Sequence, residues 1–138
     1  MAFSPDGELL ALAQGTAVRV VRTRDWTTAA VLRGHLDAVR SVALSRDGRL
    51  IVTASDDGTT RVWHAETQAS VASVSTRRTP LVSALVARET LVTAAADGVV
   101  RLYECEPCLP VKELARRAGW RVRHALTQRE LRQAHEAR

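Results

Sequence analysis

The sequence predicts an all-β fold in which short antiparallel strands are arranged in repeating units. Apolar and polar residues alternate over short runs, which is the pattern of half-buried strands. Asp-Gly pairs separate these runs, because glycine accepts the positive φ of tight turns. The same anchors return after 41 or 40 residues: residues 3–7 match residues 44–48, and Asp57-Gly58 matches Asp97-Gly98. A period of about 40 residues with several short strands in each unit indicates a stack of small sheets.

Three consecutive units cover residues 1–103. The first unit, residues 1–33, begins inside its own first strand, and the second, residues 34–75, is complete. The third, residues 76–103, lacks an outermost strand. Following the apolar runs, we expect strands near residues 9–13, 18–21, 28–32, 39–44, 50–55, 60–64, 69–74, 81–86, 91–95 and 99–103.

The pattern changes after residue 103. Residues 104–110 contain two cysteines and two prolines, and proline cannot donate a hydrogen bond to a strand ladder. Over residues 111–125 apolar side chains recur at helical spacing, and Thr127 followed by Glu130 has the form of a helix-capping box. We therefore expect a Cys- and Pro-rich break at 104–110, followed by a basic helical tail at 111–138.

The second unit carries four residues suited to a buried hydrogen-bond network. His35, Ser55, Asp57 and Trp63 supply donors and acceptors that could satisfy one another inside the fold. Serine, histidine and aspartate are also the residue types of a hydrolase triad. A triad serine, however, lies exposed on a strained turn of the form G-x-S-x-G, whereas Ser55 ends a predicted strand. The structural network is therefore the favoured interpretation.

The second unit also resembles a WD repeat of the β-propeller proteins. It opens with the pair Gly34-His35, turns at Asp57-Gly58 and carries Trp63 on its third strand. The resemblance implies a partial WD-repeat β-propeller of about 2.5 to 3 four-stranded antiparallel blades, with a short C-terminal α-helical tail. It also implies that His35, Ser55, Asp57 and Trp63 hydrogen-bond to one another and tie the loop before the first strand to the next two strands.

The C-terminal segment extends the resemblance. A Cys-rich turn, an Arg-rich helix and the sequence Leu126-Thr127-x-x-Glu130 are similar to the end of WD-repeat domains in large bacterial signalling proteins. In such proteins the propeller is a sensor or docking platform, which implies a non-catalytic scaffold for protein partners in signal transduction. The chain has no G-x-x-x-x-G-K-[ST] motif, so no nucleotide activity is implied.

Fewer than four blades cannot close a propeller ring alone, and an open stack exposes an apolar face at each end. Three hypotheses follow. The chain is a C-terminal portion of a longer protein that supplies further blades, or it assembles with a second copy of itself, or its tail covers one open face.

Loops that join the strands are the expected place for partner binding. Asp37 and Asp56 lie beside the network of the second unit, and Arg77 and Arg78 replace the Gly-His pair in the third. These four residues are the candidates for binding a protein partner. The same loops could equally be solvated surface.

Composition narrows the function classes. The chain has 46% hydrophobic residues, lacks a membrane-spanning apolar run and lacks a secretory signal pattern, so we expect a cytoplasmic protein without a cofactor. Its net charge of +5 comes from residues 111–138, where eight Lys or Arg face three Glu. The first alternative function is thus a nucleic-acid or membrane-surface binder acting through this tail, although a solvated helix face is favoured. The second is a metal site at Cys105 and Cys108, which supply only half of a tetrahedral zinc site.

Overall fold

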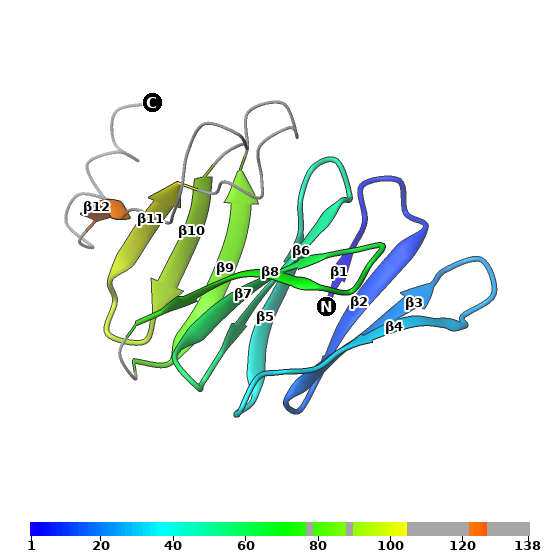
Figure 1. Ribbon diagram of the computed structural model, residues 1–138, viewed down its shortest axis with the longest axis horizontal. Coiled ribbons are helices and arrows are strands. Elements are labelled where there is room, and N and C mark those ends of the chain that lie inside the picture. Colours follow the sequence, from blue (N-terminus) through cyan, green and yellow to red (C-terminus); the bar gives the residue numbers. More distant parts are fainter. Residues whose placement is uncertain (77–78, 88–89, 105–121, 127–138) are drawn as a thin grey trace.

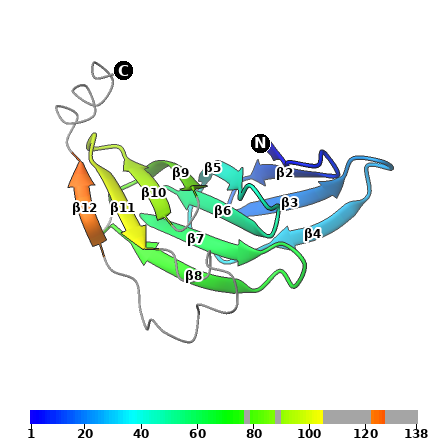
Figure 2. The ribbon, with the colours of Figure 1, turned by 90° about the horizontal axis from the view of Figure 1, so that it is seen from above.

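The structure, a computed structural model, describes residues 1–76, 79–87, 90–104 and 122–126 and contains three antiparallel sheets of four strands each. Each sheet is formed by four strands that are consecutive in the sequence (Figure 1). The three sheets pack face to face in chain order, with the middle sheet between the other two (Figure 2). In the described ranges there is no helix of the length and apolarity needed to span a bilayer.

The strands follow the apolar runs of the sequence. The first sheet contains β1 (Ala2–Phe3), β2 (Leu9–Gln14), β3 (Ala17–Arg22) and β4 (Thr28–Leu32). The middle sheet contains β5 (Val39–Leu44), β6 (Leu50–Ser55), β7 (Thr59–His64) and β8 (Ser70–Ser75). The third sheet contains β9 (Leu81–Ala87), β10 (Thr90–Ala95), β11 (Val100–Glu104) and β12 (Val122–Leu126). The predicted strands correspond to β2 through β11, with ends that agree within one residue.

The fourth strand of the third sheet corrects two expectations from the sequence. Residues 122–126 form β12, which pairs antiparallel with β11, so they are not helical and the third unit does have an outermost strand. A free edge of β11 would leave a row of unpaired backbone groups, and β12 pairs with them. Five residues are too few to establish a helical or a strand period, and pairing decides between the two structures. The remaining tail, including the helices expected there, lies outside the described residues.

Two apolar clusters hold the sheets together. Strand β6 lies at their junction, and all six of its residues are buried. Because side chains alternate along a strand, Ile51 faces the first sheet while Leu50, Val52 and Ala54 face the third. Between the first and middle sheets the buried members are Ala11, Val18, Val20, Ala30, Leu32, Val39, Val42, Ile51 and Trp63.

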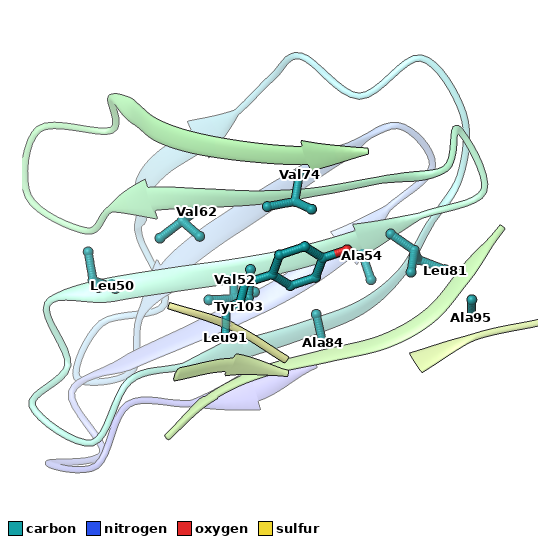
Figure 3. Close-up of a cluster of buried hydrophobic side chains, with 10 residues drawn as sticks. All are labelled: Leu50, Val52, Ala54, Val62, Val74, Leu81, Ala84, Leu91, Ala95 and Tyr103. Atoms are coloured by element: carbon teal, nitrogen blue, oxygen red, sulfur yellow. The ribbon is translucent and has the colours of Figure 1, made fainter. Parts of the chain in front are cut away.

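The second cluster lies between the middle and third sheets (Figure 3). Its aromatic member, Tyr103, is buried, and burial raises the pKa of its phenol. Tyr103 pairs with Leu91 across the third sheet, as Trp63 pairs with Ile51 across the middle sheet. The members are Leu50, Val52, Ala54, Val62, Val74, Leu81, Ala84, Leu91, Ala95 and Tyr103. Apolar contacts between neighbouring sheets therefore form the core of the described residues.

Candidate interaction surface on the middle sheet

A chain of buried hydrogen bonds crosses the middle sheet. The indole Nε1–H of Trp63 on β7 donates to Thr53 Oγ1 on β6 at 2.9 Å. Thr53 Oγ1 lies 2.6 Å from His35 Nε2, and His35 Nδ1 lies 2.9 Å from Asp57 Oδ2 in the turn after β6. The chain therefore joins the loop before β5 to the second and third strands of the sheet.

The donors of this chain follow from its chemistry. An ionised Asp57 can only accept, so His35 Nδ1–H is the donor and Nε2 is the acceptor for the Thr53 hydroxyl. Burial lowers the pKa of His35, and the neighbouring Asp57 opposes that shift only in part. A neutral imidazole with its proton on Nδ1 satisfies both of its neighbours at neutral pH.

Asp57 fixes the backbone on both sides of the network. Its burial would raise the pKa of the carboxyl, but hydrogen bonds from Thr59, the Leu36 amide and His35 outweigh burial and lower that pKa to about 2. The Leu36 N–H donates to Oδ2 at 2.9 Å, and the Thr59 N–H donates to Oδ1 at 2.8 Å. The ionised carboxylate thus binds the loop before β5 and the start of β7 at once.

Ser55 hydrogen-bonds to backbone groups of Asp37 and Asp57 rather than to the side chains of His35 and Trp63. The hydroxyl between His35 and Trp63 belongs to Thr53, two residues earlier on the same face of β6. Ser55 is fully buried, where its hydroxyl donates to the Asp37 carbonyl at 2.9 Å and accepts from the Asp57 amide at 3.1 Å. It makes no hydrogen bond to His35 among those found, so the three residues lack the geometry of a hydrolase triad.

Gly34 allows the loop to approach the network closely. Its φ is +146°, which side-chain-bearing residues rarely adopt, and an added Cβ would lie 3.0 Å from Arg61 Nη1 and 3.4 Å from Trp63. Arg61 in turn lies over the Trp63 ring, at 5.9 Å from the ring centroid. The Gly34-His35 pair thus combines a close backbone approach with a buried hydrogen-bonding ring.

The network presents an exposed surface at the end of the middle sheet. We call Leu36, Asp37, Arg40 and Asp56 the loop surface. The Leu36 side chain is 88% exposed, although its amide is bound to Asp57. Arg40 Nε donates to Asp56 Oδ2 at 2.7 Å, which lowers the pKa of the Asp56 carboxyl and raises the pKa of Arg40. Asp37 is exposed, and its carboxylate accepts a hydrogen bond from the Ala38 amide.

The structure therefore brings two of the four partner-binding candidates together, namely Asp37 and Asp56. Arg77 and Arg78 lie outside the described residues, as do Cys105 and Cys108. Leu36 and Arg40 were not singled out from the sequence, because neither an exposed leucine nor a surface arginine is unusual by itself. Among the described residues no group of three or more His, Cys, Asp or Glu side chains is placed to hold a metal ion.

The third sheet carries only part of the same network. Thr93 and Tyr103 take the places of Thr53 and Trp63 after a shift of 40 residues. Asp97 accepts a hydrogen bond from the Val99 amide at 3.0 Å and pairs with Arg101 at 4.0 Å. The recurring threonine is the sequence signal that identifies Thr53, since the residue equivalent to Ser55 is Ala95.

Solved structures define the class of the fold. The chain is similar to the β-propeller domain of Cps50 (Swd1) from Myceliophteria thermophila, with a TM-score of 0.71, 21% identity and coverage of 87% of this chain and 37% of that one. It is also similar to a chain in the mitotic checkpoint complex, with a TM-score of 0.73, 17% identity and coverage of 94% and 36%. The three sheets are thus blades of β-propeller fold.

Sequence comparison then identifies the repeat. Residues 26–64 match the family model described as WD domain, G-beta repeat. This stretch is a WD repeat, and the chain has the fold of a WD-repeat β-propeller. The expected resemblance to that family is confirmed.

Three known proteins each match less than half of the chain in sequence. The human intraflagellar transport protein 122 homolog is 40% identical over 63 residues, which are 46% of this chain and 5% of that protein. An uncharacterized WD repeat-containing protein of Synechocystis is 45% identical over 64 residues, 46% of this chain and 18% of its own. Nucleoporin Nup37 of Drosophila melanogaster is 40% identical over 73 residues, which cover 46% of this chain and 23% of that protein. The chain therefore spans less than a quarter of the length of each.

Proposed function

We propose that the chain is a non-catalytic scaffold for protein–protein interaction, with the loop surface as its docking site. The observation that supports this proposal most is the binding of the Leu36 amide to the buried Asp57 carboxylate, at 2.9 Å. This bond fixes the backbone of Leu36 to the buried network, while the residue itself is 88% exposed. A backbone that is already fixed loses less conformational entropy on binding than a mobile one.

Further backbone contacts hold the same end of the molecule. The Asp56 amide donates to the Ala38 carbonyl at 2.9 Å, which joins the two loops of the docking site. The Val39 amide donates to Gly15 of the first sheet at 2.8 Å, and the Thr76 amide donates to Gly58 at 2.9 Å. The loops of neighbouring sheets are therefore linked into one rigid end.

The chemistry of the loop surface suits a partner with an apolar pocket beside a basic group. Leu36 would enter the pocket, and the exposed Asp37 carboxylate would face the basic group. Asp56 already pairs with Arg40, so we expect it to orient that arginine rather than to bind alone. Arg77 and Arg78 remain candidates for an acidic region of a partner, and a role in a cytoplasmic signalling or sensor propeller remains part of this proposal.

The test compares the proteins retained by the immobilised chain and by two variants from an extract of the source cells. Leu36→Glu combined with Asp37→Lys alters the loop surface, while Glu66→Lys changes an exposed residue in the turn between β7 and β8, at the opposite end of the sheet. A partner of the loop surface is retained by the wild type and by Glu66→Lys and is lost from the double variant. Equal retention by all three chains contradicts the proposal.

The second candidate function is binding of nucleic acid or an anionic membrane through residues 111–138. The charge there, eight Lys or Arg against three Glu, favours it. Such binding weakens steeply as salt concentration rises and disappears when residues 111–138 are deleted. Fluorescence anisotropy with a labelled oligonucleotide, together with co-sedimentation with anionic vesicles, distinguishes the two ligands. Binding that survives the deletion excludes this candidate.

A further inference from the structure

Trp26 is an exposed aromatic residue whose position is not explained by packing. It lies in the turn between β3 and β4, and the residue is 67% exposed. Its φ is +58°, a backbone conformation that bulky residues rarely adopt. The ring contacts found among the described residues, those of Trp63 with His35 and with Arg61, do not include it. An exposed aromatic residue held in such a conformation indicates a function rather than a role in folding.

The middle sheet contains the same turn with a polar residue in place of the tryptophan. The Trp26 amide donates to the Arg22 carbonyl at 2.8 Å, and the Gln68 amide donates to the His64 carbonyl at 2.9 Å. The φ of Gln68 is +61°, so the turn forms without an aromatic side chain. Gln68 is exposed although its sheet is packed on both faces. The exposure of Trp26 is therefore a property of the turn and does not depend on what packs against the first sheet.

Hydrogen bonds fix the backbone of this turn. The Arg22 amide donates to the Thr27 carbonyl at 2.8 Å, and the Thr27 amide donates to Asp25 Oδ1 at 3.0 Å. Thr23 joins the turn to the one between β1 and β2, because its hydroxyl donates to the Gly7 carbonyl at 2.6 Å. A backbone that is already ordered loses little conformational entropy when a ligand binds to its side chains.

The charges around this turn favour a cationic ligand. The two joined turns, residues 4–8 and 22–27, carry three carboxylates and two guanidinium groups, those of Asp6, Glu8, Asp25, Arg22 and Arg24. Arg24 Nε lies 3.3 Å from Asp25 Oδ2, so these two charges neutralise each other. The carboxylates of Asp6 and Glu8 then face the single charge of Arg22. A net negative surface attracts a basic side chain and repels the phosphates of a nucleic acid.

The chain itself pairs a cation with a tryptophan at another position. Arg61 lies over the Trp63 ring, at 5.9 Å from the ring centroid. Tryptophan is the aromatic side chain that attracts a cation most strongly, because its ring face carries negative charge density. Trp26 offers the same ring face, and the nearby Arg24 donates from Nε to Asp25 instead.

We propose that the turn between β3 and β4 is a second docking site, at which a lysine or arginine side chain of a partner protein packs on the Trp26 ring. Glu8, which is exposed on the neighbouring turn, attracts the same side chain. Strand β4 begins at this turn and leads to the loop surface at its other end, so the two sites lie far apart (Figure 1). The chain can therefore hold two partners at once, and the proposal is independent of the loop surface.

The test selects phage-displayed random peptides on the immobilised wild-type chain and removes those that also bind Trp26→Gln. This variant receives the residue of the equivalent turn in the middle sheet, so folding is retained and is checked by circular dichroism. Gln68→Ala, at the same position of the middle sheet, is the matched control. The enriched peptides and a labelled oligonucleotide are then titrated with each chain by fluorescence anisotropy.

We expect enriched peptides that contain lysine or arginine and bind Trp26→Gln at least about tenfold more weakly than the wild type. Replacing that basic residue of the peptide by glutamine should weaken binding to a similar extent. Glu8→Gln should weaken it less, because an exposed charge contributes little, and Gln68→Ala should bind like the wild type.

Three results overturn the proposal. The first is a selection that gives no peptide whose binding depends on Trp26. The second is a set of Trp26-dependent peptides that bind equally well without a basic residue, which indicates an apolar pocket as the partner. The third is oligonucleotide binding that Trp26→Gln abolishes, since the ligand is then a nucleic acid.

Discussion

The Thr53 hydroxyl connects the buried network of the middle sheet, because it hydrogen-bonds to both His35 Nε2 and Trp63 Nε1. Replacing Thr53 by valine keeps the shape of the side chain and leaves two buried nitrogen atoms without a partner. We expect the free energy of unfolding to fall by about 2 to 6 kcal/mol, since each of the two unsatisfied buried groups costs about 1 to 3 kcal/mol. Urea unfolding followed by Trp fluorescence measures the change.

The matched control for Thr53→Val is Thr67→Val, in the exposed turn between β7 and β8. This variant removes a solvated hydroxyl and should stay within about 0.5 kcal/mol of the wild type. If Thr53→Val is as stable as Thr67→Val, the hydrogen-bond chain does not stabilise the fold.

Acid should weaken this network in two steps. The pKa of His35 lies below its ordinary value of about 6.5, and that of Asp57 is lowered to about 2 from an ordinary value of about 3.9. The unfolded chain therefore binds more protons than the folded chain as the pH falls, and the free energy of unfolding decreases. The stabilisation is complete above about pH 7 and declines as His35 of the unfolded chain becomes protonated. It declines further between about pH 4 and pH 2, where Asp57 becomes protonated.

Urea unfolding at several pH values, compared between the wild type and Asp57→Asn, isolates the second step. The variant lacks the carboxylate, so its free energy of unfolding should fall less steeply than that of the wild type between about pH 4 and pH 2. If the two curves run parallel over that range, the hydrogen bonds to Asp57 do not lower its pKa in the folded chain.

Sequence reasoning located this network but assigned its hydroxyl to the wrong residue. Thr53 and Ser55 are two positions apart, so both lie on the same face of β6, and strand periodicity cannot distinguish them. The recurrence of threonine at position 93 favours Thr53, and the geometry of His35 and Trp63 decides the matter. The role of Leu36 could not be predicted, because it depends on a backbone amide rather than on a side-chain type.

At the scale of elements, periodicity and turn chemistry were sufficient to predict strands β2 through β11 but not strand β12. Alternation and Asp-Gly turns are local signals, whereas the pairing of β12 with β11 joins Val122 to Tyr103 across a long connection. Residues 122–126 are too few for the two- and three-residue periods to be distinguished. A contact of this kind depends on the free edge of β11, which the sequence of the tail does not reveal.

A chain that ends at residue 121 tests the contribution of β12. We expect the β11 amides that face β12 to exchange with deuterium faster in this shortened chain, because their partners are gone. Amides of β5 and β6, which are paired within the middle sheet, should exchange as in the full chain. Hydrogen exchange followed by mass spectrometry separates these strands. Unchanged protection throughout β11 would mean that β12 does not pair there.

At the scale of the whole molecule, the stack of sheets holds the loops at the ends of the strands in fixed positions. The middle sheet is covered on both faces by apolar clusters, so its loops are positioned by a rigid body. The period of 40 or 41 residues predicted this stacking from the sequence, because one sheet of that size cannot bury its two faces alone. The sequence alone does not say which sheet faces pack on each other; the structure shows this.

The central claim is that the buried network holds the loop surface in place, and the deuterium exchange rate of the Leu36 amide tests it most directly. This amide belongs to a residue whose side chain is 88% exposed, and the protection it receives comes from Asp57. We predict that it exchanges at least about tenfold more slowly than an unprotected loop amide in the wild type, and at nearly the unprotected rate in Asp57→Ala. Exchange at the unprotected rate in the wild type would contradict the claim.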